Sequence, residues 1–123
     1  MRCLISLFGV DKVRIYPGMR TETQNGGKIV IGNNVSVGQN FHVVAVQNEL
    51  KIGNNVTISG NVFISNCDHT FNEENSLALE QPLIIKDTLI EDNCFIGYGT
   101  VILAGTHLGK HCIVGANSVV RGT

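Results

Sequence analysis

Aliphatic residues recur at every sixth position along most of this chain. They occupy Ile31, Val37 and Val43, then Ile52, Ile58 and Ile64, then Ile84, Ile90, Ile96, Ile102, Leu108, Val114 and Val120. A valine or a small residue usually follows four positions after each aliphatic, and Gly often follows directly. A period of six matches neither the 3.6-residue period of a helix nor the two-residue alternation of a strand.

We therefore expect each hexad to form one short strand and one tight corner, so that three hexads close a triangular coil of about 18 residues. The aliphatic residue of each hexad points inward and stacks on its counterpart one coil away. Gly and Asn crowd the remaining positions, where we expect corners that need a positive φ. The predicted fold class is all-β, a parallel β-helix with a filled core.

The hexad frame breaks at two places. Nine residues separate Val43 from Ile52 instead of six, which predicts an enlarged corner around residues 47–49. Between Ile64 and Ile84, residues 68–83 do not carry the repeat, which predicts a loop extruded from the prism, with a turn or two of helix within 73–80. A loop on a rigid scaffold is a common place for function.

These breaks divide a single β-helix domain, residues 1–123, into four segments. Residues 1–24 are expected to form a looser N-terminal coil or cap, residues 25–67 and 84–123 the hexapeptide coils, and residues 68–83 an active-site loop. No polar cap follows the last hexad at Thr123. Because this leaves an open sheet edge, we expect the natural chain to continue, or a partner to cover the edge.

Composition narrows the function classes. The chain is 43% hydrophobic and 15% charged, with a formal net charge of -1 and no basic block, which argues against a nucleic-acid partner. Four scattered Cys residues without a C-x-x-C pair indicate neither a disulfide framework nor a zinc ribbon, and they fit a reducing cytosol. The apolar run at residues 3–8 is too short for a transmembrane segment and lacks a signal-peptide cleavage site, so we expect a cytoplasmic chain.

The hexads from Ile84 to Arg121 resemble the C-terminal coils of the hexapeptide-repeat acyltransferases, which include galactoside, maltose and xenobiotic acetyltransferases. The passage Ser65-Asn66-Cys67-Asp68-His69-Thr70-Phe71 resembles the strand end and loop start that carry the family's catalytic His. It is most similar to the branch that O-acetylates sugars of bacterial surface polysaccharides. The resemblance covers about residues 25–121, and it implies a left-handed β-helix and a homotrimer with each active site between two subunits.

The same resemblance assigns roles to single residues. His69 matches the general base, which takes the proton of an acceptor hydroxyl during attack on the thioester of acetyl-CoA. The positions that contact CoA are matched by Gly97, Tyr98, Ala116, Arg121 and Gly122. The positions near the acceptor are matched by Asn40 and His42, although the family often has Asn where this chain has His42. Gly97 and Gly99 are also expected to allow close backbone approach to the oxyanion.

The predicted function is therefore an acetyl-CoA-dependent O-acetyltransferase that acts on a sugar hydroxyl, with no metal. One alternative within this class is N-acetylation of an amino sugar, which often uses a carboxylate near the acceptor. Glu73, Glu74 and Glu80 leave that alternative open.

Two alternatives come from other classes of protein. A zinc site of the carbonic anhydrase kind needs three converging His side chains, which His69, His107 and His111 superficially offer. A non-catalytic binding β-helix usually shows a regular outward row of side chains. The threonines of the repeat, at 88, 100 and 106, occupy its small position instead, so we expect them to pack inside.

Overall fold

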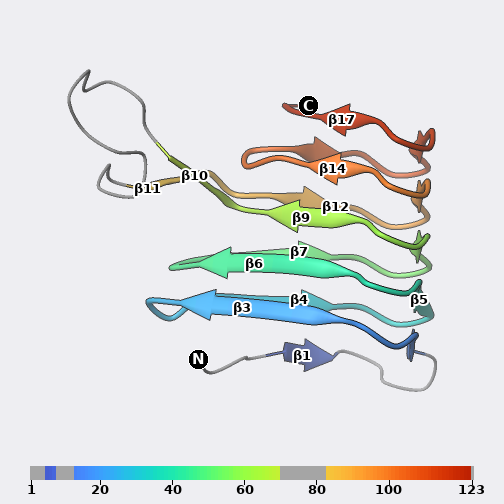
Figure 1. The fold of residues 1–123 in the computed structure, drawn as a ribbon, viewed down its shortest axis with the longest axis horizontal. Helices are drawn as coiled ribbons and strands as arrows, with labels where there is room; N and C mark the ends of the chain where they lie inside the picture. Colours follow the sequence, from blue (N-terminus) through green and yellow to red (C-terminus); the bar gives the residue numbers. More distant parts are fainter. Residues whose placement is uncertain (1–4, 8–12, 70–82, 123) are drawn as a thin grey trace.

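The computed structural model describes residues 5–7, 13–69 and 83–122. All regular structure in these ranges is β-strand, and no described residue is helical. The strands wind as successive coils of a prism, from the N-terminal coil at the bottom of Figure 1 to the C-terminal coil at its top. The predicted all-β parallel solenoid is confirmed, and the left hand stays a prediction from the resemblance.

Three parallel five-stranded sheets form the faces of the prism. Face 1 consists of β1 (Ile5–Leu7), β4 (Lys28–Ile31), β7 (Glu49–Ile52), β12 (Leu89–Ile90) and β15 (His107–Leu108). Face 2 consists of β2 (Val13–Ile15), β5 (Val35–Val37), β8 (Thr57–Ile58), β13 (Phe95–Ile96) and β16 (Ile113–Val114). Face 3 consists of β3 (Arg20–Gln24), β6 (His42–Val46), β9 (Phe63–Ser65), β14 (Val101–Ile102) and β17 (Val119–Val120).

The core is the column of aliphatic residues that the period of six predicts. Every predicted inward residue from Ile31 to Val114 is buried except Ile84, and Val120 packs against the same cluster. Fully burying one such side chain contributes roughly 1.5–3 kcal/mol. Thr88, Thr100 and Thr106 are also buried, so the prediction that they pack inside is confirmed.

Coil length changes along the prism. Val101 pairs with Val119, 18 residues later, whereas Asn34 contacts Asn55 across 21 residues in the second coil. The extra length lies at the predicted corner, where Gln47 takes a φ of 69° between β6 and β7. Within residues 1–24, which were expected to form a looser N-terminal coil or cap, β2 and β3 extend faces 2 and 3 in register with the coil above.

Asn and Gly have different roles at the corners. Seven described asparagines take φ between 52° and 63°, which confirms the expected left-handed corners. Most hexad glycines do not share this conformation. A Cβ on Gly38 would lie 2.6 Å from the backbone N of Gly60, and one on Gly53 would lie 2.3 Å from an Asp92 carboxylate oxygen. The expectation of a positive φ is therefore wrong for these glycines, which are needed because the next coil lies too close.

The extruded segment starts as a ribbon. β10 (Cys67–His69) pairs antiparallel with β11 (Leu83–Ile85), and Figure 1 shows this ribbon leaving the end of β9. Ile84 was expected to open a core hexad, but it lies opposite Asp68 in the ribbon and is 38% exposed. That prediction is wrong, because the next coil resumes only at Thr88. The expected helical turn within 73–80 lies outside the described residues.

The close approach of coils predicts different costs for two glycine substitutions. Gly38→Ala should lower the free energy of unfolding by about 1–3 kcal/mol, because its Cβ would overlap the backbone of the next coil. Gly109→Ala is the matched control, since no heavy atom lies within 4 Å of its Cβ position, and it should change stability by less than about 0.5 kcal/mol. Urea denaturation measures both values, and equal losses would contradict the steric explanation.

Candidate active site

Asn66 fixes the point where the ribbon leaves the prism. Its side chain is fully buried, its Oδ1 accepts the Val46 N–H at 2.8 Å, and its Nδ2 donates to the Val46 carbonyl at 3.1 Å. The Asn66 carbonyl accepts the Lys86 N–H at 2.9 Å on the returning strand. Only a side-chain amide offers a donor and an acceptor together at this length, so Asn66 ties both ends of the ribbon to face 3.

Ser65 and Thr88 complete the base of the ribbon. The Ser65 Oγ accepts the Cys67 N–H at 3.1 Å, which turns the chain outward. The Thr88 Oγ1 donates to the Ser65 carbonyl at 2.9 Å and accepts the Gly105 N–H at 3.1 Å. Because these groups are buried, each bond is costly to leave unmade, and the base of the ribbon is held rigidly.

His69 lies in β10, opposite Leu83, at the end of the described part of the ribbon. Asp68, opposite Ile84, precedes it, and successive residues of a strand point to opposite faces. The structure describes the backbone of His69 but not its side chain. Its role as general base therefore stays a prediction, and Glu73, Glu74 and Glu80 also lie outside the described residues.

The corner between faces 2 and 3, which we call the 2–3 corner, brings two predicted site residues together. The Asn40 Nδ2 donates to Asn61 Oδ1 at 3.0 Å, and the Asn61 Nδ2 donates to the Tyr98 hydroxyl at 2.6 Å. Tyr98 is nevertheless about half exposed. Sequence reasoning gave Asn61 only a corner role and missed that it connects Asn40 to Tyr98. The acceptor contact of Asn40 and the CoA contact of Tyr98 stay predictions.

The backbone of Gly97 and Gly99 stacks on neighbouring coils. The Gly97 N–H donates to the Val114 carbonyl at 2.8 Å, and the Gly99 N–H donates to the Gly60 carbonyl at 3.0 Å. Both glycines therefore lie close to the backbone of a neighbouring coil. Because each N–H already has an acceptor there, neither is available to an oxyanion. Among the described residues, the Tyr98 N–H between them has no acceptor.

His42 stands on the outer side of face 3. Its ring packs edge-on against Phe63, with ring centroids 5.0 Å apart. Its Nε2 lies 3.8 Å from a carboxylate oxygen of Glu22 and has no hydrogen-bond partner among the described residues. This separation is too long for a hydrogen bond. His42 is therefore a half-buried imidazole beside an acid, and its acceptor contact stays a prediction.

The other predicted CoA contacts lie in the last coil. Ala116 is exposed at the 2–3 corner, where its backbone N lies 2.6 Å from the position of a Cβ on Gly97. Arg121 and Gly122 follow β17, and the Gly122 carbonyl accepts the His107 N–H at 2.9 Å. Arg121 is exposed.

His69 and the 2–3 corner lie on opposite sides of face 3. The ribbon leaves at the end of β9, whereas Gly97, Tyr98 and Gly99 lie between β13 and β14, where the chain enters face 3. Figure 1 shows the ribbon at the left of this face, away from the corner that precedes β14. One chain therefore does not place its own His69 strand beside its own predicted CoA contacts at this corner.

The imidazoles at 107 and 111 have other surroundings. The His107 Nε2 lies 2.5 Å from a carboxylate oxygen of Glu91, and His111 forms a corner with a φ of 63°. The described part of the chain contains no group of three or more His, Cys, Asp or Glu side chains that could hold a metal ion. Burial raises the pKa of the Cys94 thiol, so Cys94 packs as a small neutral residue.

Residues 87–122 match the family model described as bacterial transferase hexapeptide (six repeats). Residues 87–122 therefore carry the hexapeptide repeat of that family. A search of curated protein sequences finds no significant match. No helix among the described residues is long and apolar enough to cross a membrane.

Solved structures share the fold of this chain. A point mutant of AntD, an N-acyltransferase from Bacillus cereus in complex with dTDP-4-amino-4,6-dideoxyglucose and coenzyme A, superposes with a TM-score of 0.79 at 14% identity. That match covers 97% of this chain and 67% of AntD. The polysialic acid O-acetyltransferase OatWY superposes with a TM-score of 0.75 at 21% identity, over 96% of this chain and 55% of OatWY.

Asn66→Ala should loosen the ribbon, because it leaves the buried Val46 N–H without its acceptor and removes one of the two donors to the Val46 carbonyl. We expect a loss of about 1–3 kcal/mol in the free energy of unfolding, and faster amide exchange at residues 67–69 and 83–85. Asn48→Ala is the control, since the exposed Asn48 side chain donates to the exposed Asp87 carboxylate at 3.0 Å and its loss leaves no buried group unpaired. Exchange rates that rise equally in both variants would contradict the anchoring role of Asn66.

Proposed function

We propose that this hexapeptide-repeat protein is a CoA-dependent acyltransferase that acetylates a sugar hydroxyl, with His69 as the general base. The observation that carries the proposal is the anchored ribbon. The repeat is interrupted between Ser65 and Thr88, where buried hydrogen bonds of Asn66 and Thr88 hold a strand that ends in His69. Nothing in the packing of a plain solenoid needs this insertion.

The chemistry requires a base and no covalent enzyme intermediate. A neutral imidazole takes the proton of the acceptor hydroxyl while its oxygen attacks the thioester carbonyl. The tetrahedral intermediate then collapses, the C–S bond breaks, and CoA leaves as a thiolate. In this scheme the Tyr98 N–H, which has no acceptor among the described residues, donates to the oxyanion, since Gly97 and Gly99 donate to neighbouring coils.

The solved structures that share this fold support an acylated sugar as the product. They leave two candidates for the acceptor group, a hydroxyl and an amine. OatWY is an O-acetyltransferase of polysialic acid, whereas AntD is an N-acyltransferase solved with an amino sugar nucleotide. We place the hydroxyl first because a hydroxyl, unlike a neutral amine, needs a general base for attack. N-acylation of an amino sugar is the second candidate, and the AntD fold match favours it.

We further propose that the active site forms between two subunits of a homotrimer in the cytoplasm. Large apolar side chains are exposed on faces 2 and 3, on both sides of the 2–3 corner. They include Ile113 at 81% exposure, Val119 at 71% and Phe95 at 45%. Phe95 and Ile113 are paired on adjacent strands of face 2, and a soluble monomer rarely exposes a large apolar patch. Packing a second chain here would bring one subunit's ribbon to the 2–3 corner of its neighbour, beside Tyr98 and Ala116.

His69→Ala should lower acetyl transfer by about 10²–10⁴-fold, the usual contribution of a general base, with the fold and oligomeric state unchanged. Thiol release from acetyl-CoA with a panel of sugars and amino sugars measures this and identifies the acceptor. His107→Ala is the control, and its transfer rate should stay unchanged. Full turnover in His69→Ala would overturn the mechanism, and loss of activity in His107→Ala would favour a His-based metal site.

Mixing two inactive variants tests the shared site. Ala116→Trp should block the CoA channel, while His69→Ala removes the base. If each site takes one residue from each subunit, trimers refolded from an equal mixture should regain roughly a quarter of wild-type activity. A mixture that stays inactive, while each variant alone still forms trimers, would place both residues in one subunit's site.

A further inference from the structure

The corner between faces 1 and 2 repeats one hydrogen bond from coil to coil. The Asn33 N–H donates to the side-chain Oδ1 of Asn54 in the coil above, at 2.7 Å. The Asn54 N–H donates in the same way to the Oδ1 of Asp92, at 2.8 Å. Each corner N–H is thus capped by a side-chain oxygen from the next coil.

The series stops at Asp92. Lys110 occupies the equivalent position of the next coil, and a lysine side chain has no acceptor atom. Among the described residues, the Asp92 N–H has no hydrogen-bond acceptor. In the lower coils a side-chain oxygen accepts the corner N–H. At the Asp92 corner, the position of that oxygen lies beside the ammonium group of Lys110.

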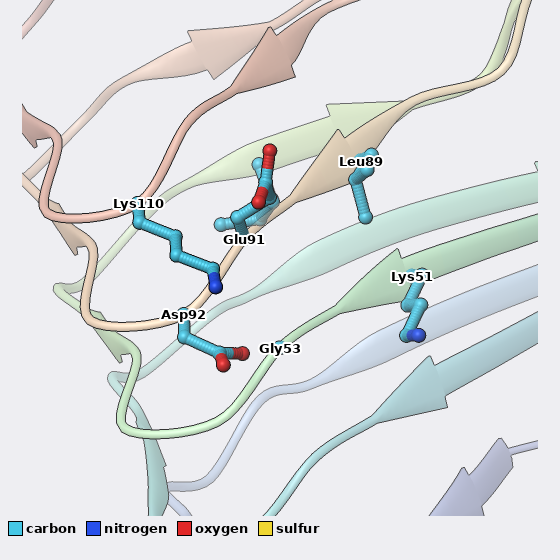
Figure 2. Close-up of a pocket in the computed structure, with 7 residues that line it drawn as sticks. Lys51, Gly53, Leu89, Glu91, Asp92 and Lys110 are labelled. Carbon is cyan, nitrogen blue, oxygen red and sulfur yellow. The ribbon is translucent and has the colours of Figure 1, made fainter.

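A pocket of about 230 Å³ lies at this place, lined by residues of three successive coils. In Figure 2, Lys51 of β7 and Lys110 stand on either side of Gly53 and Asp92, and Leu89 supplies an apolar wall. Lys51 and Lys110 are exposed, whereas Leu89 and Asp92 are half-buried. The pocket is open to a ligand from solution.

The carboxylates that line the pocket already have partners. Glu91 lies 2.5 Å from the His107 ring nitrogen, and the Asp92 Oδ1 accepts the Asn54 N–H. Figure 2 shows the two carboxylates turned away from each other. In contrast, neither Lys51 nor Lys110 forms an ion pair with any described residue. The donors left for a ligand are the two ammonium groups and the Asp92 N–H, while both carboxylates keep their negative charge.

We propose that this pocket binds a phosphate group. One phosphate oxygen accepts the Asp92 N–H, in the place that Asn54 and Asp92 oxygens fill in the lower coils, and the charge is neutralised by Lys110 and Lys51. A phosphate suits the site because it carries two negative charges and several acceptor oxygens. The volume leaves room for a diphosphate or for part of a larger phosphate ester. The pocket contains neither His69 nor the predicted CoA contacts, so this proposal is independent of the proposed function.

Titration of the intact chain with inorganic pyrophosphate tests the proposal. Calorimetry should give saturable binding, and nuclear magnetic resonance should show a large shift of the Asp92 amide signal. Lys51→Ala and Lys110→Ala should each weaken binding about tenfold, because each removes one charge-assisted contact. Lys28→Ala is the control, since Lys28 lies on face 1 outside the pocket, and it should bind as the wild type does.

Two further variants distinguish binding at a specific phosphate site from non-specific attraction to the lysine charges. Lys110→Asn restores the side-chain oxygen of the lower coils, so it should cap the Asp92 N–H and abolish binding. Asp92→Asn keeps the Oδ1 acceptor for Asn54 and removes a negative charge, so it should tighten binding severalfold. Pyrophosphate that fails to saturate, an equal loss in Lys28→Ala, or full binding by Lys110→Asn would each overturn the proposal.

Parallel titrations with CoA and with a nucleoside diphosphate identify the carrier of the phosphate. Competition of either compound with pyrophosphate, lost in Lys110→Asn, would support a phosphate site that serves a larger molecule. Pyrophosphate binding without such competition would support a site for the free anion.

Discussion

Stacking of parallel coils at a spacing of about 4.8 Å is the constraint on which this structure depends. It fills the core, because each inward aliphatic residue packs on its counterpart in the neighbouring coils. It also determines which residues the corners accept. Asparagines there take a left-handed conformation, and Gly38 and Gly97 leave room for the backbone of the next coil. A single methyl group at such a glycine would meet the neighbouring coil before it met solvent.

The proposed function lies where this regularity is interrupted. The prism tolerates the long insertion after Ser65 because Asn66 and Thr88 satisfy the buried backbone groups that the departing chain would otherwise leave unpaired. The proposed base, His69, thereby stands on a rigid frame, as a catalytic group requires. The proposed phosphate pocket follows the same logic on a smaller scale, because it lies where Lys110 ends a series of side-chain caps.

Sequence reasoning predicted the core where the repeat is strict, but it missed the break at Ile84 and the contacts between coils. Ile84 has the right spacing and the right chemistry for the core, yet it lies in the ribbon, because antiparallel pairing with Asp68 took precedence over the hexad frame. Gly97 and Gly99 were expected to allow close backbone approach to an oxyanion, and their own N–H groups bond to neighbouring coils. The link from Asn40 through Asn61 to Tyr98 joins residues of three coils, and no local pattern signals it.

The sequence by itself determined the fold class, the inward column, the asparagine corners and the position of the extruded segment. These follow from local geometry, since one hexad sets one strand and one corner. Only the tertiary structure decided which coil caps which corner, that Asn66 anchors the ribbon, and that His69 and the 2–3 corner lie apart on one chain. Those features depend on residues about 20 or more positions apart, which become neighbours only when the coils stack.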